Sequence, residues 1–374
     1  MIVAGEASGD MHAAGLVNEV RSLDSEVRFF GIGGVRMRKA GVEILVDSAS
    51  LAVVGIIEVL KHWSEISGAL KRMRGILRNE PPDLLILTDY PDFNLRLART
   101  ATECGVKVLY YISPQVWAWR QSRVKVIRER VDMMAVVFPF EEQFYQRHGV
   151  PVRFVGHPLR DEVQPSQSAA ELRAEFGLDP DNTVVGLFPG SRHSEIRRLM
   201  PVILGAAQIL HRSRPALQFL LPVASTLREE DFAPWLHDHD VPVRLVPDRA
   251  REVIEACDAI ITASGTVTLE IALLGTPMVV VYKVAPLTYF LVKRLIKIEH
   301  LALCNIVAGE QIVPELIQSN ATPQRIAGQI SAILDDPQRA RTMREQLLAV
   351  REQLGVASDS DSVGRLVIEM LADN

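Results

Sequence analysis

The sequence has few of the features that mark disulfide-rich, metal-binding or membrane-spanning proteins. Its three cysteines, Cys104, Cys257 and Cys304, are too few and too far apart for a disulfide framework or a zinc site, and they indicate a reducing compartment. The histidines are scattered, so we expect no metal site and no cofactor. No signal-peptide pattern opens the chain, and the apolar stretch at 51–57 falls short of the roughly 20 residues that span a bilayer.

Neither positive nor negative charge is in large excess. The formal net charge of −5 gives no global attraction to nucleic acid, and we expect no nucleic-acid partner. Hydrophobic residues make up 48% and charged residues 23%, which is typical of a globular protein. A chain of 374 residues is long for a single core and predicts two domains, soluble or lying on a membrane surface.

Short apolar runs alternate with helical patterns along the chain, which predicts parallel sheets covered by helices on both faces. The predicted strands are 84–87, 106–112, 133–138, 152–155, 184–188, 217–221, 243–246, 259–262 and 278–282. This is a doubly wound α/β architecture. The first strand is the exception, because only three strand-like residues precede Gly5, so either the strand is short or the true start lies upstream.

The best domain boundary lies between Pro158 and Asp181, where the chain is polar and loop-like. We therefore predict domains at 1–160 and 161–342. The helical, charged segment at about 343–374 either packs back on the first domain or forms a helix pair on the second. Open parallel sheets bind ligands beyond the carboxyl ends of their strands, so two facing sheets predict an active site in the cleft between them.

Three loops of the first domain carry candidate site residues. In the first, Gly5 to Asp10, Glu6 and Asp10 favour sugar hydroxyls over phosphate, although Ser8 or Asp10 could simply cap the following helix. The second follows the strand at 84–87. Asp89 there is a candidate base for an attacking hydroxyl, whereas Asp92 and Asn94 are better explained as helix caps.

The third loop, 113–120, contains two tryptophans and Arg120. Trp117 and Trp119 could stack on a sugar, line an acyl channel or lie at a membrane interface, although packing beneath the loop is the better explanation for one of them. Arg120 could lie near a phosphate, or belong to a solvated helix face.

Two loops of the second domain suit a nucleoside diphosphate. Gly190, Ser191 and Arg192 combine backbone N–H donors at a helix start with a guanidinium, which is a favourable arrangement for a diphosphate. In the other loop Ser264, Gly265 and Thr266 open a helix, and Glu270 lies one turn further on, where it can accept both hydroxyls of a ribose. We found no basic residue spaced to pair with Glu270 along its own helix.

Taken in order, these motifs resemble the bacterial lipid-A-disaccharide synthase family. The matching segments are Gly5–Asp10, Asp89–Asn94, Ser113–Arg120, Phe138–Glu141, Gly156–Pro158, Pro189–Arg192 and Ala263–Thr266, and the resemblance runs from Ile2 to about Leu316. It implies the GT-B fold, two Rossmann-like domains facing a cleft, with no metal. By position, Asp89 matches a catalytic aspartate, Arg192 a donor-diphosphate arginine, and Asn305 an essential asparagine near the cleft.

The resemblance also implies the reaction and the partners. The substrates would be UDP-2,3-diacylglucosamine and 2,3-diacylglucosamine 1-phosphate (lipid X), and the product a β-1′,6-linked disaccharide of lipid A biosynthesis. The family is cytoplasmic and peripheral to the inner membrane, and a homodimer is a candidate state. Cys304 departs from the family, which usually has proline there, so we expect a looser loop around Asn305.

Acylated substrates require an apolar surface. The segments at 51–61, which includes Ile56, and 287–297 are candidates for membrane or acyl-chain contact, although a buried helix explains at least part of each. Other interpretations remain open. The chain could be a UDP-N-acetylglucosamine 2-epimerase, a peptidoglycan glycosyltransferase, or a non-catalytic module that binds nucleotide sugars, since one fold hosts many reactions.

Overall fold

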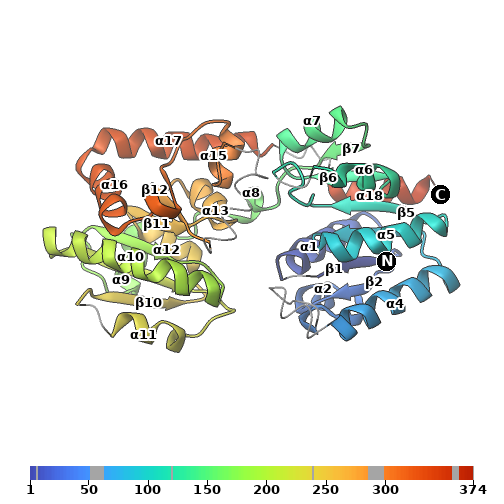
Figure 1. Cartoon of the computed structure of the whole chain (residues 1–374), viewed down its shortest axis with the longest axis horizontal. Helices are drawn as coiled ribbons and strands as arrows, with labels where there is room; N and C mark the ends of the chain where they lie inside the picture. Colours follow the sequence, from blue (N-terminus) through green and yellow to red (C-terminus); the bar gives the residue numbers. More distant parts are fainter. Residues whose placement is uncertain are drawn as a thin grey trace. The chain divides into compact units, whose positions relative to one another are not determined.

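The structure is a computed structural model that describes residues 1–5, 7–50, 63–118, 121–237, 240–284, 299–355 and 362–373. The chain divides into two compact units. Unit 1 comprises Met1–Pro158 together with Gly355–Asn374, and unit 2 comprises Leu159–Leu354. Each unit is a parallel sheet with helices on both faces, which is the predicted doubly wound architecture (Figure 1).

Unit 1 contains a sheet in the order β3-β2-β1-β4-β5-β6-β7. Its strands are β1 (Ile2–Ala4), β2 (Phe30–Gly33), β3 (Glu43–Asp47), β4 (Leu84–Thr88), β5 (Lys107–Tyr111), β6 (Met133–Val136) and β7 (Val152–Phe154). Its described α-helices are α1 (Ala7–Leu23), α2 (Val35–Lys39), α4 (Trp63–Asn79), α5 (Pro91–Glu103), α6 (Arg123–Arg130), α7 (Pro139–Arg147) and α18 (Val363–Ala372). The order 3-2-1-4-5 is that of a Rossmann sheet.

Unit 2 repeats this plan in the order β10-β9-β8-β11-β12-β13. Its strands are β8 (Val184–Phe188), β9 (Gln218–Val223), β10 (Val243–Pro247), β11 (Ala259–Ala263), β12 (Met278–Tyr282) and β13 (Glu315–Ile317). Its helices are α8 (Leu159–Glu162), α9 (Ala169–Glu175), α10 (His193–Ser213), α11 (Ala233–Leu236), α12 (Ala250–Ala256), α13 (Val267–Leu274), α15 (Leu303–Ala308), α16 (Pro323–Asp335) and α17 (Pro337–Gln353).

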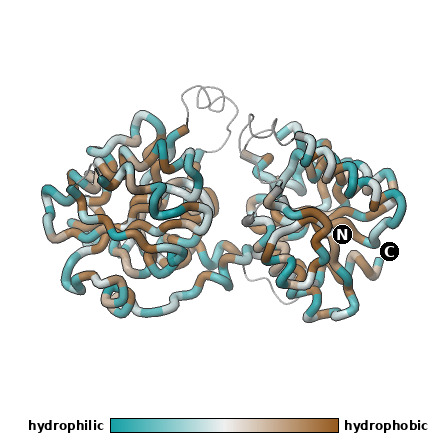
Figure 2. Tube along the Cα trace, turned by 90° about the horizontal axis from the view of Figure 1, so that it is seen from below, coloured by the Kyte–Doolittle hydropathy of each residue, from teal (hydrophilic) through white to brown (hydrophobic). Residues whose placement is uncertain are grey.

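The central strands form the cores because they are apolar along their whole length. Every residue of β4, β8 and β11 is buried, as expected for strands covered on both faces. The hydrophobic parts of the chain accordingly concentrate inside each unit (Figure 2). The strands β2, β3 and β13 were not predicted. Two glycines interrupt β2, and the partly exposed edge strands β3 and β13 contain apolar runs of only three and two residues, too short to stand out in the sequence.

The C-terminal helices are divided between the units. Helix α17 packs on α13, α15 and α16 of unit 2, whereas α18 packs on α1 of unit 1. The chain returns to unit 1 at Gly355, twelve residues after the position expected from the sequence.

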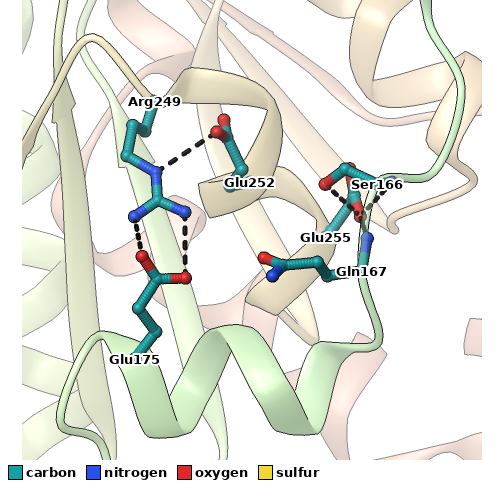
Figure 3. A network of polar contacts seen from close by, with 6 residues as sticks. All are labelled: Ser166, Gln167, Glu175, Arg249, Glu252 and Glu255. Carbon is teal, nitrogen blue, oxygen red and sulfur yellow. Dashed lines mark hydrogen bonds and ion pairs between the residues drawn. The ribbon is translucent and has the colours of Figure 1, made fainter.

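Polar contacts fasten the segment that follows α8 to helix α12, within unit 2. The carboxylate of Glu255 on α12 accepts hydrogen bonds from the backbone N–H groups of Ser166 and Gln167 (Figure 3). Beside it, Arg249 pairs with Glu175 through two nitrogens and with Glu252. Helices α9 and α12 are thereby joined on one side of the sheet.

Within the part of the chain that the structure describes, none of the helices combines the length and the hydrophobicity needed to span a bilayer.

Candidate functional site

The turn after β4 holds Asp89 in an unusual backbone conformation. Asp89 and Tyr90 have φ angles of 51° and 45°, in the left-handed region that side chains rarely adopt. The Asp89 carbonyl accepts hydrogen bonds from Asn94 Nδ2 (2.6 Å) and Tyr110 Oη (2.5 Å), which hold this conformation. Such outliers cluster at functional sites. The turn therefore presents Asp89, half-buried, at the carboxyl edge of the sheet.

Tyr110 and Gly5 lie close to this turn. Tyr110 is buried, and this burial together with the nearby Asp89 charge raises the pKa of its hydroxyl well above its usual value. The turn after β1 approaches closely, because a Cβ on Gly5 would lie 2.5 Å from the Tyr90 ring. Glycine is therefore needed at position 5, and this explains part of the motif there.

Asp10, at the end of the first motif, is occupied by contacts within unit 1. The Asp10 carboxylate accepts the N–H groups of Gly34 (2.6 Å), Arg36 (2.9 Å) and Met37 (3.2 Å), so it caps the start of α2 and is buried. This corrects both expectations for Asp10, because its carboxylate is turned to backbone N–H groups rather than to sugar hydroxyls, and the helix that it caps is α2 rather than α1. Ser8 lies exposed in the first turn of α1, and Glu6 lies outside the described residues.

The loop after β5 is held by one of its own tryptophans, which is buried. Trp117 is only 7% exposed and donates its Nε1–H to Glu141 at 2.9 Å, so it packs beneath the loop. Trp117 is thus the one of the two tryptophans for which packing beneath the loop was expected, and its covered indole cannot stack on a substrate in this conformation. Trp119 and Arg120 of the same loop lie outside the described residues, as does Ile56.

Two buried histidines lie near the same edge of unit 1. His12 on α1 and His157 after β7 meet edge to face, with ring centroids 6.3 Å apart. Burial lowers the pKa of His12 to about 4 and that of His157 to about 3. His12 Nδ1 has no hydrogen-bond partner among the described residues, so nothing there offsets the desolvation of a charged ring.

We expect unit 1 to lose stability in acid through His12. A depressed folded pKa means that the unfolded chain binds the proton more tightly, so stability is complete above about pH 6.5 and falls until the pH reaches about 4. In His12→Leu, the difference in unfolding free energy between pH 7 and pH 4.5, measured by urea titration, should shrink by about 2 kcal/mol. The exposed His237→Leu in unit 2 is the control, and equal shrinkage in both variants would contradict the assignment.

Unit 2 has a pocket where its two predicted loops meet. Strands β8 and β11 are neighbours, so the turns that follow them lie side by side at the carboxyl edge. They line a cavity of about 370 Å³, to which Gly190, Ser191, Arg192, Ser264, Gly265, Thr266 and Glu270 all contribute. The N-terminal ends of α10 and α13 open onto this cavity, and both can direct backbone N–H groups at an anion.

Glu195 is a pocket residue that the sequence analysis missed. Its carboxylate accepts the Ser191 N–H (3.0 Å) and pairs with Arg192 Nη1 (3.2 Å). Gly190 has a φ of 110°, and a Cβ there would lie 2.2 Å from the Glu195 carboxylate. The signal was present in the sequence, since a glutamate at the third helical position commonly reaches back to the residues before the helix.

Glu270 has a basic partner, although not along its own helix. Arg251 on α12 places its Nε 3.4 Å from Glu270 Oε2, so the cation comes from a neighbouring helix, which spacing along one helix does not reveal. Glu270 is 23% exposed, and burial raises its pKa while Arg251 opposes that shift. The carboxylate therefore remains accessible to a ligand at the pocket wall.

Asn305 is buried inside unit 2 with no exposed surface. Its Nδ2 donates to Val313 O (3.0 Å) and Glu315 Oε1 (2.7 Å), and its Oδ1 accepts the N–H groups of Ile312 (2.9 Å) and Val313 (3.0 Å). All of its side-chain groups are thus occupied, and we no longer expect it to touch a substrate. Cys304 is buried beside it in the first turn of α15, so the expected loose loop is a helix.

We expect Asn305→Ala to weaken unit 2 by about 3 kcal/mol, because two buried N–H groups would lose their acceptor. UDP binding should weaken as well. Glu315, which Asn305 contacts, also holds Leu301 N, and Leu301 O accepts the Ser264 hydroxyl at 3.0 Å. Thermal unfolding and UDP titration test this, with the exposed Asn320→Ala as control. A variant with normal stability would refute the structural role.

Metal binding has no support among the described residues, where no group of three or more His, Cys, Asp or Glu side chains is placed to hold an ion.

Comparisons with known proteins separate family from fold. A lipid-A-disaccharide synthase of Geobacter sulfurreducens is 59% identical over 371 residues, covering 99% of this chain and 97% of that one, and one of Nitrosococcus oceani is 54% identical with 99% and 95% covered. The UDP-GlcNAc 2-epimerase of Neisseria meningitidis, solved with UDP-GlcNAc, superposes with a TM-score of 0.67 at 12% identity, covering 100% and 99%.

That structural likeness shows the GT-B fold alone, because identity is low. The lipid-A-disaccharide synthetase family model, in contrast, matches residues 1–363, in agreement with the ordered motifs. With the sequence relatives, this match shows that the chain belongs to the lipid-A-disaccharide synthetase family.

Proposed function

We propose that this chain transfers 2,3-diacylglucosamine from UDP to the 6-hydroxyl of 2,3-diacylglucosamine 1-phosphate. The products would be the β-1′,6-linked tetraacyl disaccharide 1-phosphate and UDP. The observation that carries this proposal is the identity of 59% with a lipid-A-disaccharide synthase along 99% of this chain. A hexosyltransferase of the GT-B type agrees with the two parallel sheets and with the pocket lined by the turns after β8 and β11 in unit 2.

The pocket of unit 2 would hold the UDP moiety. Backbone N–H groups at the starts of α10 and α13 would bind the diphosphate, and Arg192 would add charge-assisted hydrogen bonds. Glu270 would accept the ribose hydroxyls. Arg192 pairs with Glu195 in the structure, so the incoming diphosphate must compete with a carboxylate for this guanidinium.

Asp89 of unit 1 would act as the general base. The acceptor hydroxyl attacks the anomeric carbon, its proton passes to the Asp89 carboxylate, and the bond from that carbon to the β-phosphate oxygen breaks with both electrons leaving on UDP. A single displacement of this kind inverts the anomeric configuration. Negative charge builds on the diphosphate as the bond breaks, and Arg192 and the Ser191 N–H would stabilise it once the diphosphate has displaced the Glu195 carboxylate from them.

The partners and location belong to the same proposal. Acylated substrates favour an enzyme that works at the cytoplasmic surface of the inner membrane without spanning it, and a homodimer remains a candidate state. The two apolar segments that the sequence suggested for membrane contact, 51–61 and 287–297, lie wholly outside the described residues. Membrane contact therefore rests on the sequence and on the chemistry of the substrates.

The test is UDP release from UDP-2,3-diacylglucosamine with and without the acylated glucosamine 1-phosphate acceptor. We expect release that depends on the acceptor, together with a disaccharide product seen by mass spectrometry. Release without the acceptor, or formation of an epimerised UDP-sugar, would point to another GT-B activity. UDP binding without any turnover would favour the non-catalytic alternative.

A further inference from the structure

Helix α7 holds the loop after β5 at two points. At the beginning of the loop, the hydroxyls of Ser113 and Tyr145 lie 2.7 Å apart and share a hydrogen bond. Further along, Trp117 Nε1 donates to Glu141 Oε1 at 2.9 Å. Glu141 and Tyr145 are four residues apart and so lie on one face of α7. That face acts as a clamp on residues 113–117, which we call the clamped loop.

Packing alone does not explain a glutamate in this clamp. Glu141 is 1% exposed, and burial raises the pKa of its carboxyl to about 8 despite hydrogen bonds from Trp117 and the Phe138 N–H. Burying an ionisable group is costly unless its hydrogen bonds are made. Both oxygens are used here, since Oε1 accepts from Trp117 and Oε2 accepts the Phe138 N–H at 3.3 Å.

The clamped loop begins beside the turn that carries Asp89. Strands β4 and β5 are paired with Thr88 opposite Tyr111, so both chains leave the sheet at the same level. Ile112, between β5 and the loop, has a φ of 62°, which directs the chain out of the strand. The clamped loop and the Asp89 turn thus form adjacent walls of the carboxyl edge, where open parallel sheets bind ligands.

An aromatic row supports the same edge. Trp117 meets Phe140 edge to face at 4.9 Å, Phe140 stacks on Phe138 at 5.4 Å, and Phe138 contacts His157 at 5.0 Å. The row follows the ends of the neighbouring strands β5, β6 and β7. Because Glu141 fixes the rotation of the indole, it also fixes the position at which the clamped loop rests on this row.

We propose that Glu141 is a positioning residue for the acceptor sugar, acting through Trp117 on the clamped loop. The inference rests on the proposed transferase function and adds a residue to it. Glu141 itself touches neither substrate. Its loss leaves the donor pocket of unit 2 intact, because every contact of that pocket described above lies within unit 2.

The experiment compares Glu141→Gln, Trp117→Phe and the double variant in the full-length chain. Glutamine keeps the volume and one acceptor for Trp117, but its NH2 group faces the Phe138 N–H. We expect the KM for the acylated glucosamine 1-phosphate to rise about tenfold in each single variant, with the KM for the UDP-sugar within twofold of wild type. The double variant should be no worse than the poorer single, because both changes break one contact.

Two further variants keep the test decisive. Glu142→Gln alters the next residue of α7, whose carboxylate accepts the Phe154 N–H instead, and it should leave both KM values unchanged. Tyr145→Phe removes only the hydroxyl at the other clamp point and should raise the acceptor KM alone. If Glu141→Gln proves unstable in thermal unfolding, Tyr145→Phe and Trp117→Phe decide.

The outcomes separate the two proposals. Additive effects in the double variant, or an equal rise in both KM values, would overturn the positioning role while wild-type turnover still supported the transferase. A wild-type protein that binds UDP but forms no disaccharide would overturn the function itself.

Discussion

Asp89→Asn should lower kcat for disaccharide formation by about 100-fold or more, with UDP affinity unchanged. Loss of a positioned general base typically costs about 10²–10⁴ in rate. The substitution keeps the two hydrogen bonds that the Asp89 carbonyl accepts from Asn94 and Tyr110, because it changes only the end of the side chain. Asparagine also tolerates the left-handed backbone at this position well. Single-turnover kinetics with both acylated substrates measure the effect.

The matched control for this variant is Asp92→Asn. Asp92 is an exposed carboxylate three residues further on, and it pairs with Arg123. We expect near-normal turnover from it. If Asp89→Asn kept near-normal turnover with an intact fold, the base would have to be sought elsewhere.

Arg192→Ala should lower kcat/KM for the donor by about 10²–10³, which corresponds to roughly 2.7–4 kcal/mol of transition-state stabilisation. UDP affinity should fall as well, because the guanidinium contacts the diphosphate in the ground state in our proposal. Arg192→Lys keeps the charge but loses the planar fork, so it should recover only part of the activity. Calorimetric UDP titration measures the affinity for UDP, and steady-state kinetics measure kcat/KM for the donor.

Arg197→Ala serves as the control for Arg192. Arg197 is exposed on the same helix α10, but it does not line the pocket. Unchanged donor kinetics in Arg192→Ala would remove this residue from the site. A similar loss in both variants would indicate a general electrostatic effect of α10 instead.

The sequence predicted the architecture well because the central strands are buried on both faces and therefore apolar throughout. The strands at 184–188 and 278–282 were located to the residue. Candidate loops could also be found, since ligand sites in open parallel sheets follow the strand ends. Gly190, Ser191 and Arg192 do meet Ser264, Gly265 and Thr266 at one pocket, as adjacent strands require.

Single polar residues were harder to assign, because their roles depend on partners that are distant in sequence. Asp10 caps a helix that begins 25 residues later, and Asn305 binds backbone groups of a segment that follows its own helix. Glu141 lies 24 residues from the indole that it holds. A motif shows that such residues occur together, whereas only the fold shows which contacts satisfy them.

The discontinuity of unit 1 has a consequence for how the protein is made. Helix α18 packs on α1 and buries its own Val363, Leu366 and Val367 in unit 1, and its Gly364 N–H donates to Glu19 of α1 at 3.1 Å. Yet the ribosome delivers α1 first and α18 only after all of unit 2. Domains generally fold as units during synthesis. Unit 2 can therefore complete its core while the surface of α1 that α18 covers is still exposed to solvent. Unit 1, although most of it is synthesised before unit 2, is then the last to finish folding.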